Sequence, residues 1–133
     1  MVLEIGLVGE ATLRVERAQL ASVVGSGSLD VFATPALIAL MERVACQAVA
    51  GHLRDGQTTV GTRIDVRHLA PTPLGMMITA RAELIEVDGR KLVFHVEAFD
   101  PTEKVGEGTH ERAVVDEARL VARATAKLGT VNG

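Results

Sequence analysis

Residues 34–53 read TPALIALMERVACQAVAGHL, a stretch that is almost entirely apolar. Thr34 suits the N-cap of a helix because its hydroxyl can accept a hydrogen bond from a free backbone N–H. Pro35 suits the first helical position, where a missing N–H costs nothing. Alanine and leucine fill most of the rest and favour a helix. At about 1.5 Å per residue, the stretch predicts a helix about 25–30 Å long, enough to cross a small domain.

Glu42 is the acid that stands on the apolar side of this helix. Its neighbours three and four residues away are apolar or nearly so: Ile38, Ala39, Ala45 and Cys46. A lone carboxylate in such surroundings is costly unless it is paired or protonated. Glu42 is therefore a candidate functional residue, and the alternative that it only meets solvent or a partner subunit at the edge of the apolar stripe stays open.

After the helix, the hydrophobic period changes from 3.6 residues to two, which is typical of strands. We expect residues 60–68 to alternate, with Val60, Thr62, Ile64, Val66 and His68 on one face and Gly61 on the other. Asp88-Gly89 predicts a hairpin turn between strands over 76–87 and 91–100, and a further strand follows over 105–115. An earlier strand is predicted over 10–16, and a short helix or turn over 17–24. Asp116 can cap a C-terminal helix to about Lys127, before an irregular tail over 129–133.

These elements predict an α+β fold. A helix that is apolar on most sides must be covered on most sides, and a curved antiparallel sheet wrapped around it does that. The 133 residues suit a single domain spanning 1–133.

The composition excludes several classes of function. The net charge of −3 and the absence of a Lys/Arg cluster argue against nucleic-acid binding. Cys46 is the single cysteine, so no internal disulfide forms, and we interpret it as a buried, inert thiol. The N-terminus does not resemble a signal peptide, and no apolar run reaches the length of a membrane span. We therefore predict a cytoplasmic protein that does not bind membranes.

Three residue types with complementary chemistry meet at the helix. Thr34 lies at its start, where backbone N–H groups favour negative charge. Glu42 lies about two turns on, and His68 lies on the strand face expected to meet the helix. An acid, an imidazole and a hydroxyl around an apolar cavity can hydrolyse an acyl bond. The alternatives are that Thr34 is only a cap and that His68 is an ordinary core or strand-end histidine.

The other candidates are weaker. Gly61 either relieves crowding in its strand or presents its N–H to a substrate carbonyl. We interpret His95 and His110 as solvent-facing, and His52 as the end of the helix. No two histidines have the i, i+4 spacing of a zinc site, so we expect neither a metal nor a cofactor.

Several stretches carry a family resemblance: VFATP (31–35), LME (40–42), VGT (60–62), VRHLAPTP (66–73) and GEGTHER (106–112). They resemble the fluoroacetyl-CoA-thioesterase-like group of hotdog-fold proteins, over roughly residues 5–120. The resemblance implies a homodimer or higher oligomer with acyl-CoA sites at the subunit interface. It also implies that the catalytic residues are Thr34, Glu42 and His68.

The resemblance assigns further residues to substrate binding. Gly61 matches a glycine that faces the substrate carbonyl, and Arg112 lies in the matching GTHER motif with a structural or CoA-phosphate role. Fluoroacetyl-selective members resemble each other in aromatic residues just before the helix. Here that region is the glycine–serine segment 25–29, and Phe32 is the only ring nearby. We therefore predict a thioesterase for a short or medium acyl-CoA rather than for fluoroacetyl-CoA.

Three hypotheses follow. The first is acyl-CoA thioester hydrolysis, with Glu42 acting either as general base or as nucleophile. The second is a non-catalytic protein that binds acyl-CoA or another hydrophobic small molecule in the same cavity. The third is a hotdog hydratase that adds water to an enoyl-CoA.

Overall fold

The fold is that of a computed structural model, which describes residues 2–132. The elements follow in the order β1 (Val8–Arg14), a 3-10 turn (Arg17–Gln19), α1 (Ala21–Val24), α2 (Thr34–Ala50), β2 (Gln57–His68), β3 (Met77–Asp88), β4 (Lys91–Phe99), β5 (Lys104–Asp116) and α3 (Glu117–Asn132). The five strands form one antiparallel sheet in the order β1-β3-β4-β5-β2. The prediction of an α+β fold is confirmed.

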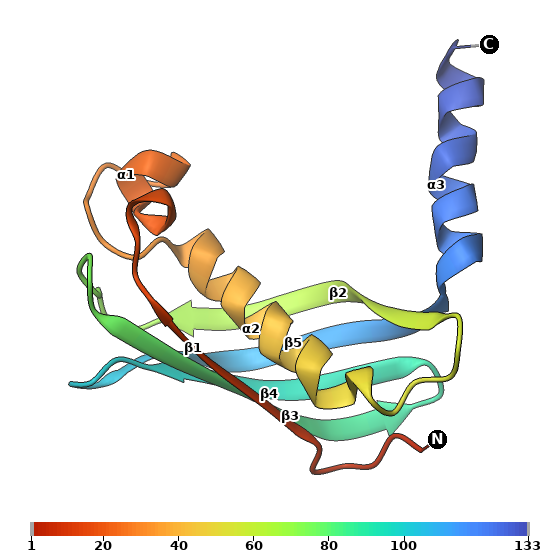
Figure 1. Ribbon diagram of the computed structural model, residues 1–133, viewed down its shortest axis with the longest axis horizontal. Coiled ribbons are helices and arrows are strands. Elements are labelled where there is room, and N and C mark those ends of the chain that lie inside the picture. The colour runs from red at the N-terminus through yellow and green to blue at the C-terminus, as the bar shows by residue number, and fades with distance from the viewer. Residues whose placement is uncertain (1, 133) are drawn as a thin grey trace.

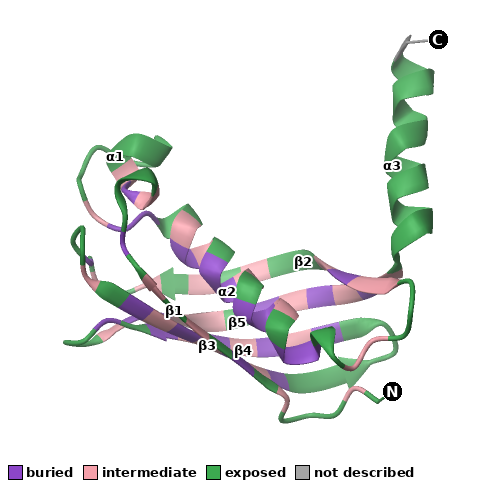
Figure 2. Ribbon diagram, in the orientation of Figure 1, coloured by how far each residue is buried: buried purple, intermediate pink, exposed green. Residues whose placement is uncertain are grey.

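The long helix α2 lies across one face of this sheet, and the hydrophobic core fills the space between them (Figure 1). The face of α2 that is buried is built from aliphatic residues at helical spacing: Leu37, Leu40, Met41, Val44, Ala45, Ala48 and Val49. Inward-facing residues of β3 and β4 alternate with half-buried ones and complete the core, as Figure 2 shows. The sheet therefore holds α2, and the site residues on it, in one fixed position.

The N-terminus of α2 differs from the prediction in one respect. Thr34 is the first residue of the helix, and its N-cap is Ala33, which forms no side-chain hydrogen bond. Pro35 does lie in the first turn, as expected. The hydroxyl of Thr34 is thus not used as a cap, because it bonds to a histidine instead.

Strand β2 contains a β-bulge that changes which residues face the helix. Gly61 pairs with Arg112 and Arg63 pairs with Glu111, so Thr62 is the extra residue. A bulge shifts the alternation of side chains by one position. The expected alternation across 60–68 is therefore wrong at its start: Gly61 faces α2 on the same side as His68.

The C-terminal helix α3 stands apart from the rest of the fold. The carboxylate of Asp116 accepts a hydrogen bond from the Arg119 backbone N–H at 3.0 Å, which confirms the predicted cap. The helix continues to Asn132, well past Lys127, so most of the tail expected to be irregular is helical. Figure 1 shows that α3 projects away from the sheet, and its residues 117–131 are all exposed (Figure 2).

Within residues 2–132, no helix is both long enough and apolar enough to cross a membrane. The assignment of residues 1–133 to one domain stays a prediction.

Candidate functional site

Thr34 and His68 form a hydrogen-bonded pair. The Thr34 hydroxyl oxygen lies 2.7 Å from Nδ1 of His68, although the two residues are 34 positions apart. They meet because the first residue of α2 packs beside the last residue of β2. The sequence predicted both as site residues, and the structure brings them together.

The pair lies in the wall of a cavity of about 330 Å³. The rest of the lining comes from the segment before α2 and the segment after β2: Ala21, Ser26, Val31, Phe32, Leu69, Ala70 and Pro71. Phe32 is the only phenyl ring among these lining residues and is 1% exposed, and its predicted place beside the substrate stays a prediction. The cavity is mostly apolar with three polar side chains, Ser26, Thr34 and His68, as expected of a small-molecule site.

His68 has one nitrogen without a partner. Its Nε2 is buried and makes no hydrogen bond within the described chain. Burial lowers the pKa of His68, and the nearby Ala70 backbone opposes this shift without bonding to Nε2. The ring is therefore neutral at neutral pH, with a nitrogen free to bond to a ligand or to move a proton.

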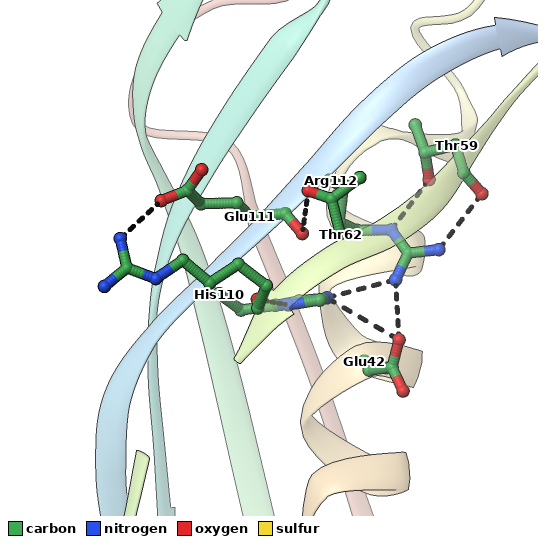
Figure 3. Close-up of polar contacts among 7 residues, drawn as sticks. Glu42, Thr59, Thr62, His110, Glu111 and Arg112 are labelled. Atoms are coloured by element: carbon green, nitrogen blue, oxygen red, sulfur yellow. Dashed lines mark hydrogen bonds and ion pairs between the residues drawn. The ribbon is translucent and has the colours of Figure 1, made fainter. Parts of the chain in front are cut away.

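Glu42 belongs to a second polar group, drawn in Figure 3. Its carboxylate oxygen Oε2 accepts a hydrogen bond from Nη1 of Arg112 at 3.2 Å. The Glu42 side chain is 41% exposed, whereas that of Arg112 is only 7% exposed. Arg112 also donates from Nε to the Thr59 hydroxyl at 2.9 Å and from Nη2 to the Thr59 carbonyl at 3.0 Å. Of its two expected roles, the structural one fits this burial, because its donors are engaged inside the chain.

His110 completes this group and contradicts the prediction of a solvent-facing ring. Its side chain is fully buried, and Nε2 lies 3.0 Å from Nη1 of Arg112. Residues two apart on a strand share a face, so the inward position of Arg112 was the signal that also places His110 inside. Thr59 is a further residue that sequence reasoning missed. The bulge in β2 shifts the side-chain alternation by one position, so simple alternation from His68 places Thr59 on the wrong face.

Gly61 lies where β2 passes closest to this group. A Cβ at Gly61 would overlap the Glu42 carboxylate and would come within 3.3 Å of Arg112 Nη1. Only glycine leaves room for the carboxylate at this point of the strand. Gly61 therefore lies beside Glu42 for a reason of space, and its predicted contact with the substrate carbonyl stays a prediction.

The two groups are separate within one chain. Thr34 and Glu42 are eight residues apart on α2, which corresponds to about 12 Å along the helix axis. That distance is too long for both to touch one reacting carbonyl. A single chain thus presents an open Thr34–His68 pair and a Glu42 group two turns away.

A cluster of possible metal-ligand residues and a groove lie elsewhere on the fold, and neither contains a predicted site residue. His95, Glu97 and Glu107 place possible metal-ligand atoms within 4.8 Å of one another. The Lys104 ammonium lies 2.6 Å from Glu107 and 3.5 Å from Glu97, so it supplies the cation in this cluster. A larger groove of about 530 Å³ lies between α3 and the end of β5, but no paired acid and base line it.

Comparisons with known proteins agree with this geometry. Residues 15–118 match the model of a family described as fluoroacetyl-CoA-specific thioesterase. A fluoroacetyl-CoA thioesterase of Streptantibioticus cattleyicolor is 42% identical over 98 residues, which are 74% of this chain and 70% of the relative.

Solved structures give the same picture. A structure of the fluoroacetyl-CoA thioesterase FlK has a TM-score of 0.89 at 32% identity, covering 96% of this chain and 98% of that one. A hot-dog-like protein from Thermanaerovibrio acidaminovorans has a TM-score of 0.84 at 26% identity, covering 92% and 91%. The predicted hotdog fold is confirmed.

Proposed function

The chain belongs to the fluoroacetyl-CoA-specific thioesterase family, and from this premise we propose that it hydrolyses the thioester bond of acyl-CoA with Thr34, Glu42 and His68 as its catalytic residues. One observation supports this assignment most directly. The Thr34–His68 pair lies in the wall of an apolar cavity, and the second ring nitrogen of His68 is buried without a partner. A buried polar atom without a partner is costly, which suggests that a substrate or a water completes its bonding.

Hydrolysis requires that water adds to the thioester carbonyl, that the carbon–sulfur bond breaks, and that the CoA sulfur gains a proton. Neutral His68 suits the transfer of that proton, because its Nε2 can accept and then release it. The Thr34 hydroxyl fixes the orientation of the ring through Nδ1 and lies where it can position the carbonyl. Gly61 borders the space in which the Glu42 carboxylate acts.

Glu42 suits one of two roles. As a general base it removes a proton from the attacking water. As a nucleophile its carboxylate attacks the carbonyl and forms a mixed anhydride, which water then hydrolyses. Both roles need a carboxylate held at a fixed position, and the hydrogen bond from Arg112 helps to hold it there.

We propose a homodimer in which two subunits complete each site. Strand β2 is an edge strand of the sheet, and an unpaired edge can pair with a second copy. A row on the flank of α2 is only partly buried: Ile38, Glu42 and Cys46. A second subunit on this side would cover the row. It would also bring Glu42 of the partner subunit toward the Thr34–His68 pair. Glu42 of the same chain lies too far from that pair to act with it.

We propose a short or medium acyl group as the substrate. The lining of the cavity is mainly aliphatic, with Phe32 as its only phenyl ring, and the segment before it contains Gly25 and Gly27. A pocket of this kind stabilises an alkyl chain by burial but offers few directed contacts for a fluorine atom.

The decisive experiment is hydrolysis of an acyl-CoA panel, including fluoroacetyl-CoA and crotonyl-CoA, by the wild type and by Glu42→Gln. We expect Glu42→Gln to lower kcat by about 100-fold or more, because it removes a reacting charge. Glu86→Gln, on the exposed pair with Lys91, is the matched control and should keep wild-type rates.

Equal rates in wild type and Glu42→Gln would remove Glu42 from the mechanism. Saturable binding without turnover would instead indicate the non-catalytic binding protein, and hydration of crotonyl-CoA the hydratase.

A mixing experiment tests the shared site. Glu42→Gln and His68→Asn subunits are inactive in the proposal, yet a mixed dimer of the two retains one intact site if the residues come from opposite subunits. Recovery of about a quarter of the wild-type activity after random mixing would support this arrangement. No recovery in a verified mixed dimer would place both residues in the same subunit. Light scattering must also give at least twice the 14.1 kDa chain mass.

A further inference from the structure

We propose that His110 is a positioning residue, which holds Arg112 in the orientation from which its guanidinium meets the Glu42 carboxylate. The proposal rests on the proposed catalytic function of Glu42. It adds a residue, His110, that acts on Glu42 through Arg112. His110 itself touches neither cavity nor substrate, because its side chain is fully buried.

The contacts of His110 determine its tautomer. Nδ1 lies 2.8 Å from the backbone carbonyl oxygen of Arg63, and a carbonyl can only accept a hydrogen bond. Nδ1 therefore carries the proton. In the neutral ring Nε2 then has a lone pair, and it accepts a hydrogen bond from Nη1 of Arg112 at 3.0 Å.

This acceptor determines where the Arg112 guanidinium points. Nη1 has two hydrogens, one for His110 Nε2 and one for Glu42 Oε2, at 3.0 Å and 3.2 Å. Thr59 holds the other side of the guanidinium through Nε and Nη2. Figure 3 shows these bonds arranged around the planar group. Without the bond to His110, Nη1 keeps a single directed contact, to the half-exposed carboxylate.

The surroundings of His110 keep the ring neutral and in place. Burial lowers its pKa, with the Arg112 charge acting in the same direction, while the Arg63 carbonyl and the Glu42 and Glu111 carboxylates oppose the shift. Phe94 of the neighbouring strand stacks on the ring, with centroids 6.3 Å apart and planes inclined by 30°. A protonated ring would lose the acceptor on Nε2 and would repel Arg112, so the neutral form is the one that positions the guanidinium.

Two amide substitutions separate the roles of the two ring nitrogens. In His110→Gln the side-chain oxygen can replace Nε2 as acceptor for Arg112, at the cost of the donor to Arg63. In His110→Asn the shorter amide can replace the Nδ1 donor, but it does not reach Arg112. The two amides differ by one methylene group, so the melting temperature of each variant is needed to separate a packing effect from the loss of the acceptor. His95→Asn, on an exposed histidine paired with Glu107, is the control for a strand histidine outside the site.

The experiment measures kcat and KM on the best acyl-CoA of the panel, together with the melting temperature of each variant. We expect His110→Asn to lower kcat by about 10- to 100-fold with little change in KM, because a small misplacement of a reacting group has an effect of that size. His110→Gln should recover most of this loss, and the kcat of His110→Asn should stay low even at assay temperatures well below its melting temperature. His95→Asn should match wild type. Equal activity in the two amide variants, or losses that follow their melting temperatures, would overturn the proposal.

A second measurement does not depend on turnover. In ¹⁵N-labelled protein, the Arg112 side-chain NH signals should show restricted rotation in wild type and in His110→Gln, and faster rotation in His110→Asn. The same rotation in both variants would also overturn the proposal. A wild type that hydrolyses no acyl-CoA would overturn the proposed function, while these signals would still decide whether His110 positions Arg112.

Discussion

Two histidines on neighbouring strands, His68 partly buried and His110 fully buried, make opposite use of the same ring. His68, at the end of β2, bonds through one nitrogen to Thr34 and leaves the other without a partner beside a cavity. His110, in the middle of β5, has both nitrogens bonded inside the chain and touches no cavity. Burial lowers the pKa of both rings, so both are neutral at neutral pH.

The difference shows that a lowered pKa alone does not identify a proton-transfer residue. A neutral imidazole acts on a substrate only if one nitrogen has no partner inside the chain and the ring lines the site. His68 meets this condition, whereas His110 fixes the direction of a neighbouring guanidinium. The comparison predicts that the two rings respond differently to the same substitutions.

The largest expected effect is at His68. An amide can accept a hydrogen bond but does not take up a proton in this pH range, so neither His68→Gln nor His68→Asn should replace the ring. We expect both to lower kcat on the acyl-CoA panel by about 100- to 10,000-fold, which is the usual contribution of general acid–base catalysis. At His110, by contrast, glutamine should recover activity. Recovery of activity in His68→Gln would show that His68 acts by hydrogen bonding alone.

The second prediction concerns Gly61, where β2 passes closest to the Glu42 carboxylate. Gly61→Ala places a methyl group where the Glu42 carboxylate lies, so the carboxylate must move. We expect kcat to fall by about 10- to 100-fold, since the displaced group is a reacting one. Gly51→Ala has open space around the added methyl group and is the matched control. An unchanged rate in Gly61→Ala would mean that the present position of Glu42 is not the active one.

The fold could be predicted from the sequence because its signals are local. The apolar stretch 34–53, the period-two strands and the Asp88-Gly89 turn each specify their element through neighbours in the chain. The bulge at Thr62 could not be predicted in this way, because it is defined by pairing with β5, about fifty residues later.

The candidate site shows the same division. Glu42 stood out as an acid on the apolar side of the predicted helix, His68 as a ring on the inward strand face, and Thr34 as a hydroxyl at the start of the helix. His110 and Thr59 did not stand out, because their importance comes from Arg112, a partner distant in the sequence from Thr59. Once Arg112 is known to face α2, the strand alternation identifies His110 as well.

A smaller effect is expected at Thr34, which is half of the pair that distinguishes His68 from His110. Thr34→Val keeps the shape of the side chain but removes the hydroxyl, so Nδ1 of His68 loses its partner. We expect kcat to fall by about 10-fold, in line with the loss of one hydrogen bond. Thr34→Ser retains the hydroxyl and should stay within about 3-fold of wild type. Equal losses in both variants would assign the effect to packing at the start of α2.

The smallest effect is on stability, and it follows from the sign of the two pKa shifts. Because burial holds the pKa of His110 below its ordinary value, the unfolded chain binds a proton more readily than the folded one as the pH falls below about 6.5. The stabilising contribution of the neutral ring is therefore complete above about pH 6.5 and decreases as the pH falls toward the folded-state pKa. His68 acts in the same direction.

We expect the melting temperature to fall by about 2–4 °C between about pH 7 and pH 5.5, a range above the titration of ordinary carboxylates. In His110→Gln this fall should be smaller, because one of the two titrating rings is gone. The same fall in both proteins would show that His110 does not contribute to the acid sensitivity of the fold.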